Sequence, residues 1–242
     1  MTVTASAPGS IMITGEHAVV YGHPAIVAAI DQRAEVRVEA LPRDQVEIRT
    51  TFGAVSTTLS ALKPEGVLRF VNACILAVAP ETGVSITVTS DIDPTLGLGS
   101  SAAVTIATLG ALAKLGARDM DIHAEALAIV RELQGRGSGA DLAASLRGGM
   151  VRYVLDHVPE PLPMPPALAL KYVGYKTPTG EVLARVAAAW EGRDVNALYA
   201  RMGGAAEAAI AAAKEKDWTS MATALDAYQR LMAQLGVSNS DL

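Results

Sequence analysis

The stretch Asp93-Pro-Thr-Leu-Gly-Leu-Gly-Ser-Ser-Ala-Ala-Val104 joins an expected strand to an expected buried helix through a glycine-rich loop. Before it, residues 84–89 alternate apolar and polar side chains, which is the period of a half-buried strand. After it, residues 102–113 carry no charge and predict a helix covered on most sides. Ser100 and Ser101 are favourable capping types for the first N–H groups of that helix.

The glycine-rich loop predicts an anion site at the start of the helix. Gly97 and Gly99 let the backbone approach whatever lies in front of the helix. Backbone N–H groups and the positive end of the helix dipole favour a negative charge there, such as phosphate. The common phosphate loop is excluded because its lysine is missing. Taken alone, these residues also fit a capped helix after a glycine turn.

Composition limits the class of protein. The 242 residues are 50% hydrophobic and 19% charged, enough for one large domain or two modest ones. A formal net charge of −5 predicts neither a nucleic-acid nor a membrane partner. The single cysteine, Cys74, lies in an apolar helical run and predicts a buried thiol in a reducing compartment. No apolar run reaches the roughly 20 residues that a bilayer requires, so we expect a soluble cytoplasmic protein.

Hydrophobic periodicity predicts further elements along the chain. Strands are expected at 2–7, 11–13, 35–39, 46–49, 149–155 and 167–172. Helices are expected at 66–79, 121–133, 181–190 and 194–235. Breaks are expected at Pro8-Gly9, at the turn 42–44 between two antiparallel strands, at Gly203-Gly204 and near Asp217.

This order of elements predicts an α+β fold with two domains. The first, residues 1–158, should be a mixed sheet with helices on one face. The second, residues 166–242, should be largely helical. The proline-rich stretch 159–166 reads as the boundary or an extended connector between them.

Three motifs resemble, in order, those of the GHMP small-molecule kinases (galacto-, homoserine, mevalonate and phosphomevalonate kinases). Gly97-Leu-Gly-Ser-Ser-Ala-Ala103 is similar to their phosphate loop. The resemblance implies that ATP is held by Gly97, Leu98, Gly99, Ser100, Ser101 and Ala102. It also allows Mg²⁺ to be held by the nucleotide's phosphates, Ser101 and water, since this ion commonly keeps several waters.

The second motif lies near the start of the chain. Ser6-Ala-Pro-Gly-Ser-Ile-Met-Ile-Thr-Gly-Glu-His-Ala-Val-Val-Tyr-Gly-His-Pro-Ala25 resembles the opening of mevalonate kinases, where Gly-Glu-His lies beside the acceptor. The resemblance implies that Glu16 and His17 bind the substrate, although a surface turn is the simpler alternative. Ser10 departs from the pattern, because these kinases place a lysine there and a serine cannot supply a cation.

The third motif is Gly137-Ser-Gly-Ala-Asp141, similar to the segment whose aspartate accepts the proton of the acceptor hydroxyl. The resemblance implies that Asp141 is catalytic, in keeping with phosphoryl transfer assisted by one carboxylate near the nucleophile. A helix-capping role is the alternative, since the dipole favours an acid in the first turn. The family's magnesium-binding glutamate corresponds to Val130, and the nearby Glu132 faces another side of the helix.

A polar turn at 175–180 is similar to a family turn near the acceptor. It makes Lys176 and Thr179 further substrate-binding candidates, with a solvated loop as the alternative. Family members usually continue past Gly236 with a helix and a glycine-rich strand and loop. We therefore expect an incomplete second domain, and weak nucleotide binding for the chain as given.

Together the motifs imply an ATP-dependent kinase that transfers the γ-phosphate to a hydroxyl of a small-molecule substrate, first of all mevalonate. Phosphomevalonate kinase and sugar kinase are alternatives within the family. A non-catalytic nucleotide or metabolite binder is the alternative from another class, because Ser10 and Val130 both depart from the family pattern. A homodimer is left open.

Overall fold

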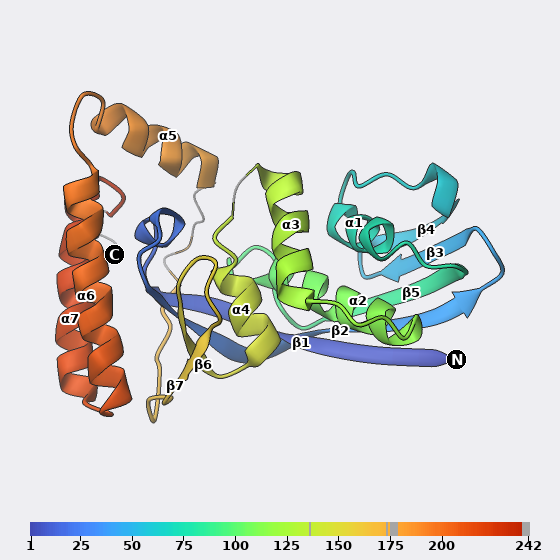
Figure 1. The fold of residues 1–242 in the computed structure, drawn as a ribbon, viewed down its shortest axis with the longest axis horizontal. Helices are drawn as coiled ribbons and strands as arrows, with labels where there is room; N and C mark the ends of the chain where they lie inside the picture. Colours follow the sequence, from blue (N-terminus) through green and yellow to red (C-terminus); the bar gives the residue numbers. More distant parts are fainter. Residues whose placement is uncertain (136, 173, 175–178, 239–242) are drawn as a thin grey trace. The chain divides into compact units, whose positions relative to one another are not determined.

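The computed structural model describes residues 1–135, 137–172, 174 and 179–238 (Figure 1). The chain forms two compact units that alternate along the sequence. The first unit consists of Met1–Ile11, Ala29–Pro94 and Leu98–Gly148. The second consists of Met12–Ala28, Thr95–Gly97 and Gly149–Leu242. These units are discontinuous in the sequence, whereas the expected domains 1–158 and 166–242 are each continuous. The division into those two domains stays a prediction.

A mixed sheet forms the base of the first unit, as predicted. Its strands are β1 (Thr2–Thr14), β2 (Ala25–Leu41), β3 (Gln45–Thr50), β4 (Gly53–Thr58) and β5 (Gly83–Ser90). Strand β5 lies between β2 and β3, antiparallel to the first and parallel to the second. The two strands around the turn 42–44 run antiparallel, as predicted, and β5 lies between them. Burial of both Val84 and Ser85 is typical of a central strand, which explains why β5 takes this place.

Strand β1 is continuous, so the expected break at Pro8-Gly9 is wrong. Proline cannot donate a backbone hydrogen bond and is tolerated where one side of a strand is unpaired. Strand β1 pairs with β2 alone among the described strands, which leaves such a side.

Four α-helices of the first unit lie over one face of its strands, as predicted (Figure 1). They are α1 (Arg69–Val78), α2 (Ser100–Leu115), α3 (Ile122–Gln134) and α4 (Ala140–Arg147), with a short 3₁₀ helix η2 at Leu59–Ala61. Strand residues Val36 and Ile86 share one apolar cluster with Leu109 of α2 and Leu127 of α3. Cys74 of α1 lies in the same cluster, fully buried, and burial raises the pKa of its thiol.

The second unit combines a small strand pair with helices. Its elements are the 3₁₀ helix η1 (Ala18–Tyr21), strands β6 (Met150–Tyr153) and β7 (Glu160–Leu162), and helices α5 (Thr179–Ala189), α6 (Asn196–Lys214) and α7 (Trp218–Leu235). Ala25–Ala28 at the start of β2 pair with β6, so β2 contributes to both units. No strand forms at 167–172, where the side chains are exposed, and that prediction is wrong.

Helix α6 runs through Gly203-Gly204, so the expected interruption there is wrong. A Cβ added at Gly203 would lie 2.4 Å from Nδ1 of His23, whereas one added at Gly204 would meet nothing within 4 Å. Gly203 therefore permits a close approach between the helix and His23. The break near Asp217 is confirmed, because the Asp217 carboxylate accepts the Ser220 N–H and caps α7.

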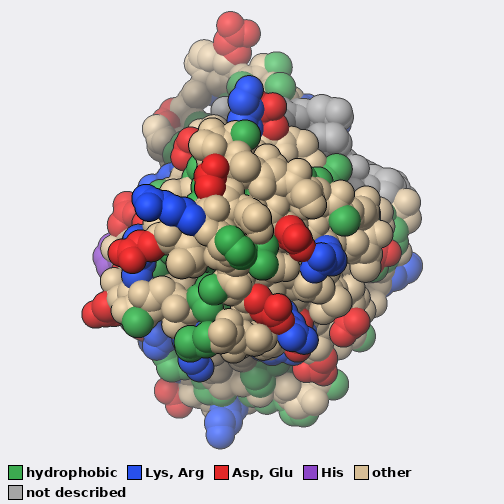
Figure 2. All heavy atoms as spheres, turned by 90° about the vertical axis from the view of Figure 1, so that its right-hand side faces the viewer, with side chains coloured by type: hydrophobic (Ala, Val, Ile, Leu, Met, Phe, Trp, Pro, Cys, Tyr) green, Lys and Arg blue, Asp and Glu red, His purple; other side chains and the backbone are tan. Residues whose placement is uncertain are grey.

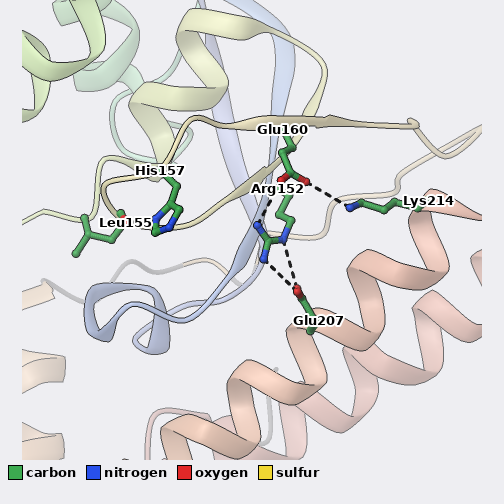
Figure 3. A network of polar contacts seen from close by, with 6 residues as sticks. All are labelled: Arg152, Leu155, His157, Glu160, Glu207 and Lys214. Carbon is green, nitrogen blue, oxygen red and sulfur yellow. Dashed lines mark hydrogen bonds and ion pairs between the residues drawn. The ribbon is translucent and has the colours of Figure 1, made fainter.

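A charged network joins β6, β7 and α6 in the second unit (Figure 3). Arg152 Nη2 lies 3.0 Å from Glu207 Oε1, and Arg152 Nη1 lies 3.8 Å from Glu160 Oε1. Lys214 Nζ lies 3.3 Å from the other oxygen of Glu160. Because the acidic partners are exposed, each pair is expected to contribute at most about 1 kcal/mol.

Charged side chains of both signs are interspersed on the face shown in Figure 2. None of the described helices combines the length and the apolar character needed to cross a membrane.

Candidate functional site

The centre of the candidate site is the pair Ser10 and Asp141 in the first unit. Ser10 is fully buried in β1, and its Oγ donates a hydrogen bond of 2.9 Å to Oδ1 of Asp141. The Ser10 backbone N–H donates to the carbonyl oxygen of Leu98 at 3.0 Å. One residue of β1 thus holds both the aspartate of α4 and the loop that precedes α2. The sequence singled out Ser10 and Asp141 separately and did not predict that they interact.

Gly99 is the N-cap residue of α2 and has a φ of 67°. A Cβ at this position would lie 2.1 Å from the Ser10 Oγ, so both the backbone conformation and the space require glycine. Ser100 and Ser101 are the first residues of the helix, and no side chain caps it at Gly99. The expectation that these serines cap the helix is therefore wrong. The start of α2 keeps the uncapped N–H groups and dipole end that suit an anion.

The other residues predicted to hold ATP lie at the start of α2 or directly before it. Leu98 and Ala102 lie in the first unit with Gly99, Ser100 and Ser101, and Gly97 belongs to the second. Ala102 is buried in the core, whereas Ser101 is exposed. The Ser101 carbonyl accepts the Thr105 hydroxyl at 2.8 Å, which fixes the first turn of α2.

Asp141 lies in the first turn of α4, whose N-cap is Gly139. The aspartate is exposed, so a solvent-borne molecule can reach it. Ser138, in the same segment, accepts the Ala140 N–H through its hydroxyl at 3.3 Å. The geometry presents the Asp141 carboxylate beside Ser10 rather than at the N-cap position.

Glu16 and His17 lie together in the second unit, directly before η1. The backbone carbonyl of Glu16 accepts both the Ala18 N–H and the Tyr228 hydroxyl, each at 2.7 Å. His17 has φ 63° and ψ −56°, an unusual backbone for a residue with a side chain. Burial lowers the pKa of His17 below its ordinary 6.5, because a buried site favours the neutral form of the imidazole.

The structure gives fewer contacts for the remaining residues that the sequence singled out. Thr179 is the first residue of α5, and Lys176 lies outside the described residues. Val130 packs against the core of the first unit, and a Cβ added at Gly137 would lie 2.9 Å from its Cγ1. Within the described ranges, no three His, Cys, Asp or Glu side chains are grouped so that they could hold a metal ion.

Residues 66–149 match the family described as GHMP kinases N terminal domain. A mevalonate kinase from Pyrococcus abyssi is 33% identical over 218 residues, covering 78% of this chain and 62% of the relative. A mevalonate kinase from Thermococcus sibiricus is 30% identical over 276 aligned residues, covering 100% of this chain and 80% of the relative. The chain spans 62% and 63% of the length of the mevalonate kinases from P. abyssi and Pyrococcus furiosus.

Solved structures show the same fold. A Lin0012 protein from Listeria innocua superposes with a TM-score of 0.86 at 22% identity, covering 98% of this chain and 79% of that one. Mevalonate kinase from Methanococcus jannaschii has a TM-score of 0.79 at 20% identity, covering 100% and 82%. The fold of this chain is therefore the one that these solved structures share. This chain belongs to the GHMP kinase family, and mevalonate kinases are among its relatives.

Proposed function

We propose that this protein is an ATP-dependent kinase that phosphorylates a hydroxyl group of mevalonate. The observation that carries the proposal is the 2.9 Å hydrogen bond between Ser10 and Asp141, in the same unit as the uncapped start of α2. A carboxylate near the nucleophile and backbone groups that hold the phosphates are two of the parts that phosphoryl transfer to an alcohol uses. Mevalonate is proposed as the acceptor because relatives that are 33% and 30% identical to this chain are mevalonate kinases.

The residues at the start of α2 fit the phosphates of a nucleotide. Backbone N–H groups from Gly99 to Ala102 would hold the phosphates, and the lack of a Cβ at Gly99 keeps the approach open. Bound ATP supplies the γ-phosphoryl group that is transferred. The exposed hydroxyl of Ser101 could give Mg²⁺ one ligand, with phosphate oxygens and water supplying the others.

Asp141 would accept the proton of the acceptor hydroxyl. The Ser10 hydroxyl donates to one carboxylate oxygen and so fixes the orientation of the group. Glu16, His17, Lys176 and Thr179 remain proposed contacts of the acceptor. A cytoplasmic location is also part of this proposal.

A non-catalytic nucleotide binder is the second candidate, favoured by one observation. Ser10 occupies the position of the family's lysine and gives Asp141 a hydrogen bond without a cation. A cation near the transferring phosphoryl group stabilises developing charge, an effect often worth a few kcal/mol. The two candidates differ in turnover, not in nucleotide binding.

The test is a coupled assay of ADP release with mevalonate, phosphomevalonate and galactose as acceptors, on the parent chain and on Asp141→Asn. We expect release with mevalonate, and a loss of about a hundredfold or more in the variant with nucleotide affinity retained. Release with another acceptor only would correct the substrate. Nucleotide binding without release for any acceptor would establish the second candidate.

A further inference from the structure

His17 stands at the centre of an uncommon backbone turn. The Ala18 N–H donates to the Glu16 carbonyl at 2.7 Å, across only one intervening residue. With φ 63° and ψ −56° at His17, this is a γ-turn whose central residue has positive φ, a rare and strained arrangement. Such strain persists only where the surrounding structure fixes it, and it is concentrated at functional sites.

A second donor holds the same carbonyl oxygen. Tyr228 of α7 donates its hydroxyl to the Glu16 carbonyl at 2.7 Å, from 212 residues away in the sequence. The ring of Tyr228 is 3% exposed and packs with Ala18 in the apolar cluster of the second unit. One side of the turn is thus tied to a buried side chain that does not itself reach the surface.

The residues that this turn orients are those that the family resemblance gives to the acceptor. Rotating the Glu16–His17 peptide would break both hydrogen bonds to its carbonyl and would redirect the two side chains. A purely structural explanation is that a buried phenol hydroxyl needs an acceptor. That explanation accounts for the hydrogen bond but not for the strained histidine.

We propose that Tyr228 is a positioning residue, whose hydroxyl holds the γ-turn at His17 and thereby sets the directions of the Glu16 and His17 side chains toward the acceptor. The proposal rests on the proposed function, in which these two side chains contact the acceptor. It assigns a role in substrate binding to a side chain of α7 that has no motif around it.

The test compares Tyr228→Phe with Tyr199→Phe. Tyr228→Phe removes only the Tyr228 hydroxyl, which donates to the Glu16 carbonyl. The second is a matched control, because Tyr199 is a 2% exposed tyrosine of the same cluster, stacked on Tyr21. For Tyr228→Phe we expect the KM for mevalonate to rise about tenfold, the loss expected for one hydrogen bond, with the KM for ATP unchanged. For Tyr199→Phe we expect both constants to match the parent.

Hydrogen exchange of the Ala18 amide gives a readout that does not depend on turnover. We expect this amide, protected by the Glu16 carbonyl, to exchange about tenfold faster in Tyr228→Phe and at the parent rate in Tyr199→Phe. Parent values of both the acceptor KM and the exchange rate in Tyr228→Phe would overturn the proposal, as would equal changes in the two variants.

An inactive parent chain would refute the proposed function by itself. In that case calorimetric binding of mevalonate replaces the KM, and the Ala18 exchange rate still decides whether Tyr228 holds the turn. An active parent with an unchanged Tyr228→Phe variant would refute the role of Tyr228 alone.

Discussion

Gly99 meets two independent constraints, a φ of 67° and a Cβ position only 2.1 Å from the Ser10 Oγ. We predict that Gly99→Ala displaces Ser10, disturbs the start of α2, and weakens MgATP binding at least about tenfold, because a side chain there would both clash and strain the backbone. Titration calorimetry with MgATP measures the effect. Gly110→Ala on the same helix is the control, since its added Cβ meets Ala5 only at 3.8 Å. Parent affinity in Gly99→Ala would show that the phosphates bind elsewhere.

Ser10 contributes a single donor to Asp141. Replacing it by alanine keeps the volume close and removes the hydroxyl, so the carboxylate loses the group that orients it. A hydrogen bond to a charged group is worth about 1.5–3 kcal/mol, and we predict that Ser10→Ala lowers kcat at least about tenfold while MgATP affinity stays. Steady-state kinetics together with calorimetry test this. An unchanged kcat would mean that the orientation of Asp141 is set by other groups.

His17 makes stability depend on pH. Its folded pKa lies below the ordinary 6.5 because of burial, so below about pH 6.5 the unfolded chain binds more protons at this residue than the folded chain does. Stability therefore falls as the pH is lowered through this window. We predict a smaller loss of Tm between pH 7 and pH 5 for His17→Asn, since asparagine tolerates positive φ and does not titrate. Equal losses in the parent and the variant would exclude this contribution.

At the level of single residues, the sequence identified the groups that motifs mark and missed the partners that only folding brings to them. Asp141 and Gly99 stand in recognisable glycine-rich segments. Ser10, which donates to Asp141, is 131 residues away from it, and Tyr228, which donates to the Glu16 carbonyl, is 212 residues away. Tyr228 has the helical spacing of an ordinary core residue, so nothing local distinguishes its hydroxyl.

Among the elements, helix α6 gives a sharp test because it contains two adjacent glycines in different surroundings. Alanine is favoured over glycine in a helix interior by roughly 0.5–1 kcal/mol. We predict that Gly204→Ala raises the free energy of unfolding by about that amount, because its Cβ meets nothing within 4 Å. Gly203→Ala should lower it, because its Cβ would lie 2.4 Å from the His23 ring. Thermal or denaturant unfolding of both variants decides, and a stabilised Gly203→Ala would contradict the close approach.

Periodicity predicted most of these elements, and tertiary contacts explain the exceptions. Helix α3, which is capped by Asp121, strand β5 and helix α2 all follow from the local pattern of apolar residues. The placement of β5 between β2 and β3 could not be predicted, because strand order is decided by long-range pairing. The glycines of α6 suggested a break, but one of them is required by packing against His23.

For the whole molecule, each unit contains a different kind of side chain whose exposure reports on the unfolding of that unit. The single cysteine, Cys74, is buried in the first unit, and the two tryptophans, Trp190 and Trp218, lie in the second. Strands β1 and β2 each contribute residues to both units. Unfolding of one unit should therefore destabilise the strands of the other. We predict that thiol reactivity and tryptophan fluorescence change together along a guanidinium series. A fluorescence transition that is complete before Cys74 reacts would show that the units unfold independently.

The continuity of β2 through both units also restricts how such a gene can recombine. A single crossover with a relative's gene after Gly148 would take residues 149 onward from the second parent, yet the second unit would keep Met12–Ala28 from the first. The pairs from Ala25 with Tyr153 to Ala28 with Met150 would then join strands of different parentage inside one hydrogen-bonded ladder. Viable chimeras should therefore be those whose parents share compatible side chains along this ladder, whatever their similarity elsewhere.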